Sequence, residues 1–509
     1  MNKIKVLYVA SEAAPFIATG GLGEVAGSLP KALSEKYDDK IDIRVVLPLY
    51  QGIWDRSEFE FIGKTSVPLG WRQQYCGVFK KKLNNVTYYF IDNEYYFKRS
   101  ECYGHFDDGE RFAFFSKAAL YILPMIEFMP DIVHANDWQA SLVPIYLATK
   151  YYSYEGYRDI KSVITIHNIE YQGIFDLGIS EDIFDIHGKE KGLIEYRGAI
   201  NLLKGAMETS SIISTVSESY SREIFDDYYA HGLAEIIQKN SSKLRGILNG
   251  IDIDVYNPET DNALFENYNV NNIEGKSINK LNLQSLTGLP QNKDIPVIGI
   301  ISRLVKHKGF DLITEAMEEI LKERVQLIIL GKGDRGYELF FKSMQDSYNE
   351  KVSARIDFNS DLARKIYAGA DLFLMPSISE PCGIAQMISS RYGTVPIVRE
   401  TGGLKDSIKD ASLGEGNGFT FREQSPHALY DAVKRALHVY NNKEDWKGLV
   451  KSVMEIDFSW KKSAEKYFDM YLSLLNKSNE VNKFNEVNKF NEVDKFNEVN
   501  KFNEVELGE

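Results

Sequence analysis

Cysteine is scarce in this chain of 509 residues, which contains only Cys76, Cys102 and Cys382. The number is odd and the spacings are long, a pattern that argues against a disulfide framework and against a cysteine-ligated metal. We therefore expect reduced thiols and a cytoplasmic location.

Long hydrophobic runs are absent as well. No stretch approaches the roughly 20 consecutive apolar residues that a membrane helix requires. The apolar run at residues 4–10 is brief and Glu12 follows it closely, so it does not have the form of a signal peptide. We expect no membrane partner.

An excess of positive charge is also missing. Sixty Lys and Arg residues stand against 73 Asp and Glu residues, which gives a net charge of −13 and a pI near 5.3. Nucleic acids and anionic membranes attract positive fields, so neither is an expected partner. A neutral polymer, or a small anion held in a local basic pocket, stays open.

What the chain does contain is a repeated alternation of short β-branched runs with longer helical patterns, such as the helix expected over residues 110–126. The runs include "IKVLYVA", "IRVVLP", "VTYYFID", "DIVHAND", "SVITIHN" and "SIISTVS", and the alternation restarts at "PVIGIISRL", "VQLIILGKGD", "DLFLMPS" and "VPIVRETGG". Runs that are apolar on both faces are typical of buried parallel strands. The pattern predicts two doubly wound α/β domains, joined through the polar segment 248–275.

Ligands of such sheets bind beyond the carboxyl ends of the strands. Polar residues that follow the runs are therefore expected to line a cleft: Ser11, His134 to Asp137, His167, Asn168, Ser302 and Arg303.

The C-terminal segment differs in kind, because the hexapeptide "NEVNKF" recurs with little change through residues 478–509. Its apolar residues fall at every third position and would wind around a helix instead of forming one stripe. Eight acidic side chains and four lysines accompany them. The composition predicts a disordered, solvated tail, with a partner-binding segment as the alternative.

The segment "FIATGGLGEV" follows the first predicted strand and carries Gly20, Gly21 and Gly23. Bare backbone at these positions could approach a phosphate or a sugar, with the positive end of a helix behind it. A merely structural turn is the alternative interpretation.

Two segments of the second half combine charge with a strand end. In "SRLVKHKGFDLI", Arg303 and Lys308 could converge on a diphosphate, or they could be solvated surface cations. In "SISEPCGIAQ", Glu380 precedes Cys382 and Gly383 at the start of an expected helix. Glu380 could accept sugar hydroxyls, or it could simply favour the helix dipole.

Two segments of the first half suit carbohydrate. "HANDWQASL" places Asp137 beside Trp138, so that a carboxylate could bind hydroxyls while a ring stacks on a pyranose. A helix cap at Asp137 with a core Trp138 is the alternative. His167 and Asn168 end the strand of "TIHNIEYQG", where a lone histidine is more often structural than catalytic.

Taken together, these segments resemble the bacterial and plant glycogen and starch synthases over about residues 3–475. The resemblance includes "TGGLGEVAGSLPKAL", "HANDWQASLVPIYL", "HNIEYQG", "LNGIDIDVYNP", "SRLVKHKG", "EPCGIAQ", "YGTVPIVRETGGLKD" and "DFSWKKSAEKYFDMY". It implies two Rossmann-like domains facing a central cleft (GT-B type). The implied divisions are an acceptor-side domain at 1–247, a nucleotide-sugar domain at 248–456, a helix returning to the first domain at 457–477, and the repeat tail at 478–509.

The resemblance also implies an activity: transfer of glucose from ADP-glucose to the non-reducing end of an α-1,4-glucan such as glycogen, with retention of configuration and without cofactor or metal. It implies catalytic roles for Glu380, His167 and Asp137. Donor and acceptor contacts are implied for a larger set of residues: Gly20, Gly21, Asn249, Arg303, Lys308, Phe358, Cys382, Gly383 and Trp138.

The chain departs from the family pattern at several positions. Ala18 stands where the family motif K-T-G-G-L has its donor-binding lysine. Ile378 and Ser379 replace an Arg-Phe pair, Lys98 replaces an Asp, and Gln139 replaces a His. The departures favour one alternative function, a catalytically weak paralogue that acts as a glucan-binding or assembly subunit. A transferase for another nucleotide sugar or a small acceptor is a further alternative, against which "EPCGIAQ" and "YGTVPIVRETGGL" speak.

Overall fold

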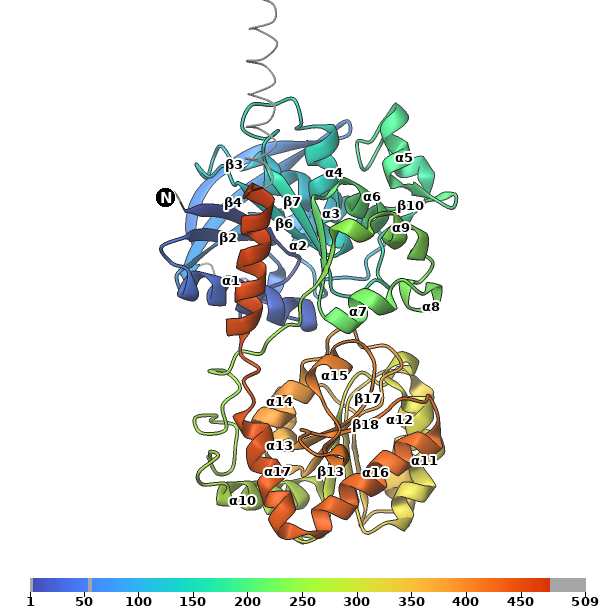
Figure 1. Cartoon of the computed structure of the whole chain (residues 1–509). Coiled ribbons are helices and arrows are strands. Elements are labelled where there is room, and N and C mark those ends of the chain that lie inside the picture. Colours follow the sequence, from blue (N-terminus) through green and yellow to red (C-terminus); the bar gives the residue numbers. More distant parts are fainter. Residues whose placement is uncertain (1–2, 54–56, 477–509) are drawn as a thin grey trace, which may run out of the picture.

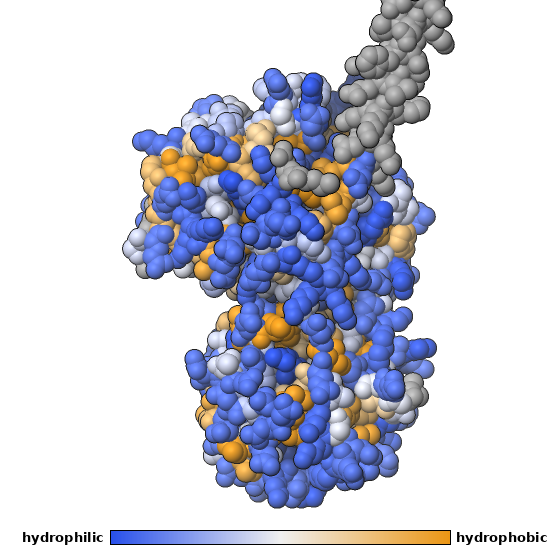
Figure 2. Space-filling model, turned by 60° about the vertical axis from the view of Figure 1, so that its left-hand side comes forward, coloured by the Kyte–Doolittle hydropathy of each residue, from blue (hydrophilic) through white to orange (hydrophobic). Residues whose placement is uncertain are grey.

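The structure is a computed structural model that describes residues 3–53 and 57–476. It has two α/β lobes, one above the other in Figure 1, which meet at a narrow waist in the space-filling view (Figure 2). The disordered tail predicted for residues 478–509 lies outside the described residues. In the described part of the chain, no helix combines the length and the apolar composition needed to cross a bilayer.

The N-terminal lobe is built on a nine-stranded sheet in the order β12-β11-β7-β6-β1-β2-β5-β4-β3. Seven of its strands form the parallel part: β1 (Ile4–Val9), β2 (Ile41–Pro48), β5 (Val86–Asp92), β6 (Ile132–Asn136), β7 (Lys161–Ile166), β11 (Ile212–Thr215) and β12 (Leu244–Gly246). Six of the quoted β-branched runs therefore form strands as predicted. Their side chains are buried on both faces because helices cover the sheet from both sides (Figure 1).

The edge of this sheet was not predicted. There β3 (Glu60–Leu69) and β4 (Arg72–Leu83) form an antiparallel hairpin that pairs with β5. Polar and charged residues occur in short runs within both strands, and most of β3 is exposed or partly exposed. Such a strand lacks the continuous apolar run that identifies the buried strands.

Nine helices and a small second sheet complete the described part of the N-terminal lobe. The helices are α1 (Gly21–Lys36), α2 (Glu94–Phe97), α3 (Asp108–Tyr121), α4 (Leu142–Thr149), α5 (Lys191–Ile194), α6 (Leu202–Thr209), α7 (Glu218–Glu223), α8 (Asp227–Ala230) and α9 (Ala234–Lys239). The small sheet is antiparallel and contains β8 (Ile174–Phe175), β9 (Glu195–Tyr196) and β10 (Ala199–Asn201).

The helix predicted over residues 110–126 was wrong at its C-terminal end, because α3 ends at Tyr121. Pro124 lies three residues further on. A proline has no N–H to donate and disfavours a helical conformation at the residue before it, so it favours an early end of the helix. The apolar residues continue beyond this end, and for that reason the pattern predicted a longer helix.

The C-terminal lobe has a six-stranded parallel sheet in the order β15-β14-β13-β16-β17-β18. Its elements are α10 (Glu274–Thr287), β13 (Val297–Ile301), α11 (Phe310–Lys322), β14 (Gln326–Leu330), α12 (Arg335–Ser347), β15 (Val352–Arg355), α13 (Ser360–Gly369), β16 (Leu372–Met375), α14 (Ala385–Arg391), β17 (Val395–Arg399), α15 (Gly402–Ser407), β18 (Phe419–Phe421), α16 (Pro426–Asn441) and α17 (Lys443–Glu455).

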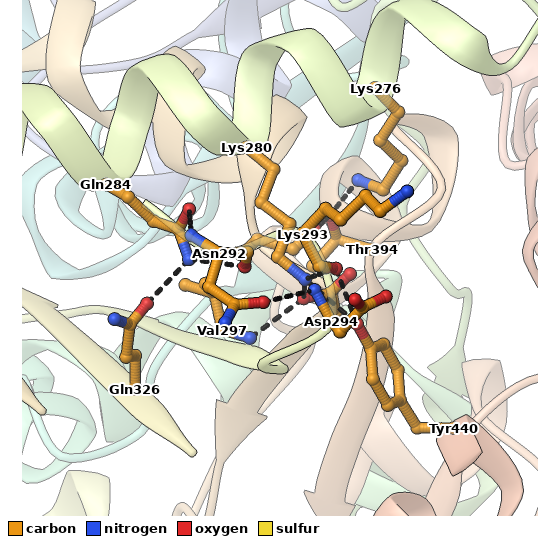
Figure 3. Close-up of polar contacts among 12 residues, drawn as sticks. Lys276, Lys280, Gln284, Asn292, Lys293, Asp294, Val297, Gln326, Thr394 and Tyr440 are labelled. Atoms are coloured by element: carbon orange, nitrogen blue, oxygen red, sulfur yellow. Dashed lines mark hydrogen bonds and ion pairs between the residues drawn. The ribbon is translucent and has the colours of Figure 1, made fainter. Parts of the chain in front are cut away.

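Helix α10 is attached to this lobe by buried lysines (Figure 3). The Lys276 ammonium donates to two backbone carbonyls and to Thr394 Oγ1 at 2.7 Å, and burial lowers the pKa of Lys276 to about 7. Lys280 forms a 2.7 Å ion pair with Asp371 and a 2.9 Å hydrogen bond to the Tyr440 hydroxyl. Buried cations persist only with such partners, so these contacts specify where the first helix of the lobe docks.

The chain returns to the N-terminal lobe at its end. A helix over residues 460–476, red in Figure 1, packs beside α1. The Phe468 ring stacks on Tyr37 with ring centroids 4.0 Å apart, and the Tyr471 hydroxyl lies 2.7 Å from His134 Nδ1. The outgoing and returning segments also touch, because the Ile251 N–H donates to Phe458 O at 2.8 Å. Two neighbouring segments of the chain, around Ile251 and Phe458, therefore connect the lobes.

Candidate active site

A cavity of about 1230 Å³ lies between the lobes and is lined by both. The carboxyl ends of β6 and β7 deliver Asp137 and His167 from the N-terminal lobe. The end of β13 delivers Ser302 and Arg303 from the other lobe. The expected placement of ligand-facing residues beyond parallel strand ends is met at these positions.

Three polar residues expected in the cleft, Ser11, His134 and Asn136, are buried and are not among its lining residues. Ser11 bonds the Tyr103 hydroxyl at 2.7 Å and is fully buried. His134 is still inside β6, and its ring lies between Thr165 and the hydroxyl of Tyr471 on the returning helix. Burial lowers the pKa of His134 to about 3. The prediction erred because β6 extends to Asn136, so the cleft begins three residues later than the His.

The glycine loop opens onto the cavity. Gly20 and Gly21 are exposed and line it, and the 16-residue helix α1 begins at Gly21. The loop is held from below, since the Thr19 N–H donates to the Glu12 carboxylate at 2.5 Å. Ala18 is exposed at the start of the loop and is not among the lining residues. Free N–H groups at a helix start suit an anion.

Asp137 sits in a strained backbone, with φ 53° and ψ −173°. Its carboxylate does not cap the following turn but accepts the backbone N–H of His167 at 2.7 Å. Burial raises the pKa of Asp137 to about 7, although the N–H groups of His167 and Asn168 oppose the shift. Strain of this kind costs about 1–3 kcal/mol and is concentrated at functional sites. Asp137 can therefore exchange a proton near neutral pH inside the cavity.

His167 is oriented by an amide. The Asn136 Nδ2 donates to the carbonyl of Val9, which leaves Asn136 Oδ1 as the acceptor for His167 Nε2 at 2.9 Å. The proton of the imidazole is therefore on Nε2. Burial lowers the pKa of His167 to about 3, so the ring is neutral at physiological pH and its partners fix its orientation.

Trp138 combines the two roles considered for it. It is half-buried, its ring meets Phe112 edge-on at 5.2 Å and Phe175 at 5.7 Å, and it also lines the cavity. The ring is thus packed on the lobe while part of it remains available to a ligand.

In the C-terminal lobe, Lys308 and Glu380 meet. Lys308 Nζ lies 2.7 Å from Glu380 Oε2, which also accepts the Ser377 hydroxyl at 2.9 Å. Glu380 therefore does not act through the dipole of α14, which begins only at Ala385. Gly309, after Lys308, has φ 78°, and a Cβ there would lie 2.0 Å from Pro376 O. Only glycine lets the two segments approach closely enough for the ion pair.

The turn after Glu380 is closely packed. Cys382 is buried, and burial raises the pKa of its thiol to about 12, so the thiol stays neutral. Gly383 has φ 66°, and a side chain there would collide with Gln386. Asn249 is also buried at the cavity wall, and its Oδ1 has no hydrogen-bond partner among the described residues.

One predicted site residue is not brought to the cavity. Phe358 is 85% exposed and is not among the lining residues, so the substrate contact that the resemblance implies for it stays a prediction. Arg303 is exposed and does line it.

Several lining residues were missed by the sequence reasoning: Glu12, Tyr103, Glu170, Tyr171, Tyr228, Tyr229, His231, Lys306, His307 and Gln424. For Glu12 a signal existed, because it is a charged residue directly after a buried strand. For Tyr228 and His231 no local signal existed, since only the packing of α8 brings them to the cavity.

Comparisons with known proteins show the family of the chain. The model of the starch synthase catalytic domain matches residues 5–239, and that of the group 1 glycosyl transferases matches residues 287–449. A glycogen synthase of Clostridioides difficile is 45% identical over 478 residues, covering 92% of this chain and 99% of the relative. A glycogen synthase of Clostridium beijerinckii is 46% identical over 478 residues, which again cover 92% of this chain and 99% of the relative.

The chain belongs to the glycogen synthase family.

Two solved structures have the same fold as this chain. The catalytic domain of starch synthase IV from Arabidopsis thaliana, bound to ADP and acarbose, matches with a TM-score of 0.87 and 32% identity. The match covers 93% of this chain and all of that one. A sucrose-phosphate synthase from Thermosynechococcus elongatus, at 14% identity and a TM-score of 0.59, shares the fold alone. The two lobes and their cleft are thus those of a GT-B glycosyltransferase with glycogen synthase function.

Proposed function

We propose that this glycogen synthase transfers glucose from ADP-glucose to the non-reducing end of an α-1,4-glucan, with retention of configuration. The observation that carries the proposal is the pairing of Lys308 with Glu380 at the wall of a cavity shared by both lobes, with the buried Ser377 hydroxyl bonded to the same carboxylate. Support also comes from the Arabidopsis relative, which was bound to ADP and to acarbose.

In this proposal the diphosphate of the donor lies between the two lobes. Arg303 and Lys308 contact its oxygens from one side, and the N–H groups of Gly20 and Gly21 face it from the other. Positive charge and free N–H groups stabilise the negative charge that develops on the leaving ADP. Lys308 is paired with Glu380 in this structure, so donor binding exchanges one anionic partner for another.

The sugar lies nearer to Glu380, His167 and Asn249. Once Lys308 turns to phosphate, the Glu380 carboxylate is available to the glucose hydroxyls and to positive charge at the reacting carbon. Asp137, with its pKa raised to about 7, lies on the acceptor side, where it can hold the incoming hydroxyl. We infer a cytoplasmic location from the three free, buried cysteines.

The test is incorporation of radiolabelled glucose into glycogen by the purified protein, with ADP-glucose and UDP-glucose supplied in parallel. We expect incorporation from ADP-glucose well above that from UDP-glucose, and none with Glu380→Ala. Preference for UDP-glucose would contradict the proposed donor. Absence of incorporation from both, with glycogen binding retained, would favour the non-catalytic glucan-binding subunit.

A further inference from the structure

The N-terminal lobe presents an indole ring to solvent in a fixed orientation. Trp71 occupies the turn between β3 and β4 and is 78% exposed. Its Nε1–H donates to Asp182 Oδ1 at 2.7 Å, and the Arg72 guanidinium lies 4.7 Å from the ring centroid. One face and one edge of the ring are thus held by partners, while most of its surface is open.

The turn that carries Trp71 is built for this presentation. Arg72 donates to both carboxylate oxygens and to the carbonyl of Asp182, at 2.9–3.1 Å. Gly70 has φ 56°, and a Cβ at this position would lie 2.3 Å from the same carbonyl. Holding a Trp side chain in one orientation removes its rotational entropy before any ligand arrives. An exposed ring fixed at this expense has no packing role in the described lobe.

Two more exposed aromatic residues belong to the same region. Tyr95 on α2 is 68% exposed, and Phe106, just before α3, is 98% exposed. Arg99 connects Tyr95 to the residue after Phe106, since it donates to the Tyr95 carbonyl at 3.1 Å and to the carboxylate of Asp107 at 2.5 and 2.6 Å. A group of three exposed rings differs from apolar residues scattered singly, which need no explanation.

The same contacts connect Trp71 to this group and to the cavity. Arg72 lies 3.4 Å from Glu110, which accepts the hydroxyl of Tyr96, the neighbour of Tyr95. Glu110 is in the first turn of α3, and Asp108 at the start of that helix lines the cavity. Trp71 is thus connected, through Arg72 and Glu110, to the helix whose start lines the cavity.

We propose that Trp71, Tyr95 and Phe106 form a binding surface for the α-glucan chain where it leaves the cleft, with Trp71 as the principal contact. The proposal rests on the glucan acceptor proposed above. A glucan offers a C–H face to stack on a ring and hydroxyls that bond to neighbouring charges, and Trp71 is flanked by Arg72 and Asp182. A polymer bound only at its reacting end would not use a fixed ring outside the cavity.

The surface gives the enzyme a preference for long acceptors. A chain of a few glucose units fills the cavity without reaching Trp71, whereas glycogen reaches both. Removal of an anchoring aromatic side chain commonly costs an interface about tenfold or more in affinity. The loss falls on polymer binding and leaves the chemical step unchanged, because Trp71 is not part of the cavity wall.

The experiment is affinity electrophoresis in gels with and without glycogen, in the absence of any nucleotide sugar. We expect Trp71→Ala to weaken glycogen retention about tenfold, and Trp71→Phe to keep most of it because a ring remains. The matched control is Tyr152→Ala. Tyr152 is 60% exposed but lies between α4 and the amino end of β7, an interior strand that is separated from the β3–β4 hairpin by four other strands of the sheet.

Kinetics separates this surface from the reacting site. For Trp71→Ala we expect the KM for glycogen to rise about tenfold, with the KM for maltotriose, the KM for the donor and kcat unchanged. Retention of Trp71→Ala equal to that of the parent, with or without a change in oligomeric state, would overturn the proposal. An equal loss in Tyr152→Ala would do the same. Failure of ADP-glucose as donor would leave the gel result intact, so the two proposals fail separately.

Discussion

Lys308 and Glu380, 72 residues apart in sequence, form an ion pair with Nζ 2.7 Å from Oε2 at the wall of the cavity. The pair is shielded, with side-chain exposures of 19% and 9%. In the proposed mechanism the pair separates when the diphosphate binds, which places the carboxylate at the sugar only when the donor is present. In this mechanism the Lys308–Glu380 contact couples donor binding to the release of the Glu380 carboxylate.

The first prediction concerns this carboxylate. Glu380→Gln keeps the size of the side chain and an acceptor for Ser377, but it loses the negative charge. We expect kcat to fall by at least about a hundredfold, as for a group that acts directly on the reacting centre. Steady-state kinetics with ADP-glucose and glycogen measures the change.

The control is Glu400→Gln. Glu400 pairs with Arg422, whose side chain is 84% exposed, and neither residue lines the cavity. We expect parental activity in the control and parental melting temperatures in both variants. A Glu380→Gln enzyme with near-normal kcat would remove Glu380 from the mechanism.

The second prediction concerns Ala18, which is exposed at the entrance of the glycine loop. A lysine here would reach toward the proposed diphosphate from the first lobe. One charge-assisted contact in a site that excludes water is worth roughly 1.5–3 kcal/mol. We expect Ala18→Lys to raise kcat/KM for ADP-glucose about ten- to a hundredfold, with glycogen retention unchanged.

Ala18→Met supplies the length of the lysine side chain without its charge, and we expect it to behave as the parent does. If Ala18→Lys leaves kcat/KM unchanged or lowers it, then a cation such as Lys306 at the same cavity already fills the role, or the loop does not approach the donor.

The third prediction follows from the raised pKa of Asp137. The folded protein binds a proton at this carboxyl up to about pH 7, whereas the unfolded chain releases it near pH 4. Between these values the native state holds more protons, so the contribution of Asp137 to stability falls as the pH rises. Asp137→Asn removes this slope and keeps an acceptor for the His167 N–H.

Relative to the parent, Asp137→Asn is therefore expected to gain up to about 2 kcal/mol of unfolding free energy between pH 5 and pH 7.5. Over the same pH range we expect the activity of Asp137→Asn to be lower than that of the parent. Urea denaturation at several pH values gives the two curves. Parallel curves would show that Asp137 is ionised throughout and that burial does not control its proton.

The fourth prediction concerns the returning helix at residues 460–476. Phe468 is only 6% exposed and stacks on Tyr37 of the N-terminal lobe at an interplanar angle of 10°. Phe468→Ala is expected to lower the unfolding free energy by about 3 kcal/mol, because it removes a large buried ring. Equilibrium unfolding in urea measures the loss.

Lys466→Ala is the control from the same helix. Its ion pair with Glu218 is half-exposed on both sides, at 52% each, and such pairs contribute about 0–1 kcal/mol. If both variants lost the same unfolding free energy, the stacking of Phe468 on Tyr37 would contribute no more to holding the helix than an exposed ion pair does, which would contradict the prediction.

Much of the architecture could be read from residues close together in the chain. Apolar runs bounded by polar residues identified the parallel strands, because burial on both faces acts on every residue of such a run. The same logic placed Asp137 and His167 at strand ends and, with the family motifs, Glu380 and Arg303 in the site. The strand ends were predicted correctly because strand burial is a local signal, whereas the roles of these residues in the reaction stay predictions.

The tertiary structure decided everything that depends on residues distant in sequence. It paired Lys308 with Glu380, fixed Trp71 through Asp182, and seated His134 against Tyr471 instead of in the cleft. It also added the β3–β4 hairpin, whose half-exposed strands carry no apolar run. The sequence alone determined the buried parallel strands and the alternation of strands with helices, since burial on both faces leaves a local apolar pattern. Which side chains meet depends on how lobes and returning helix pack, and the entropy of closing those long loops is overcome only when the whole core forms.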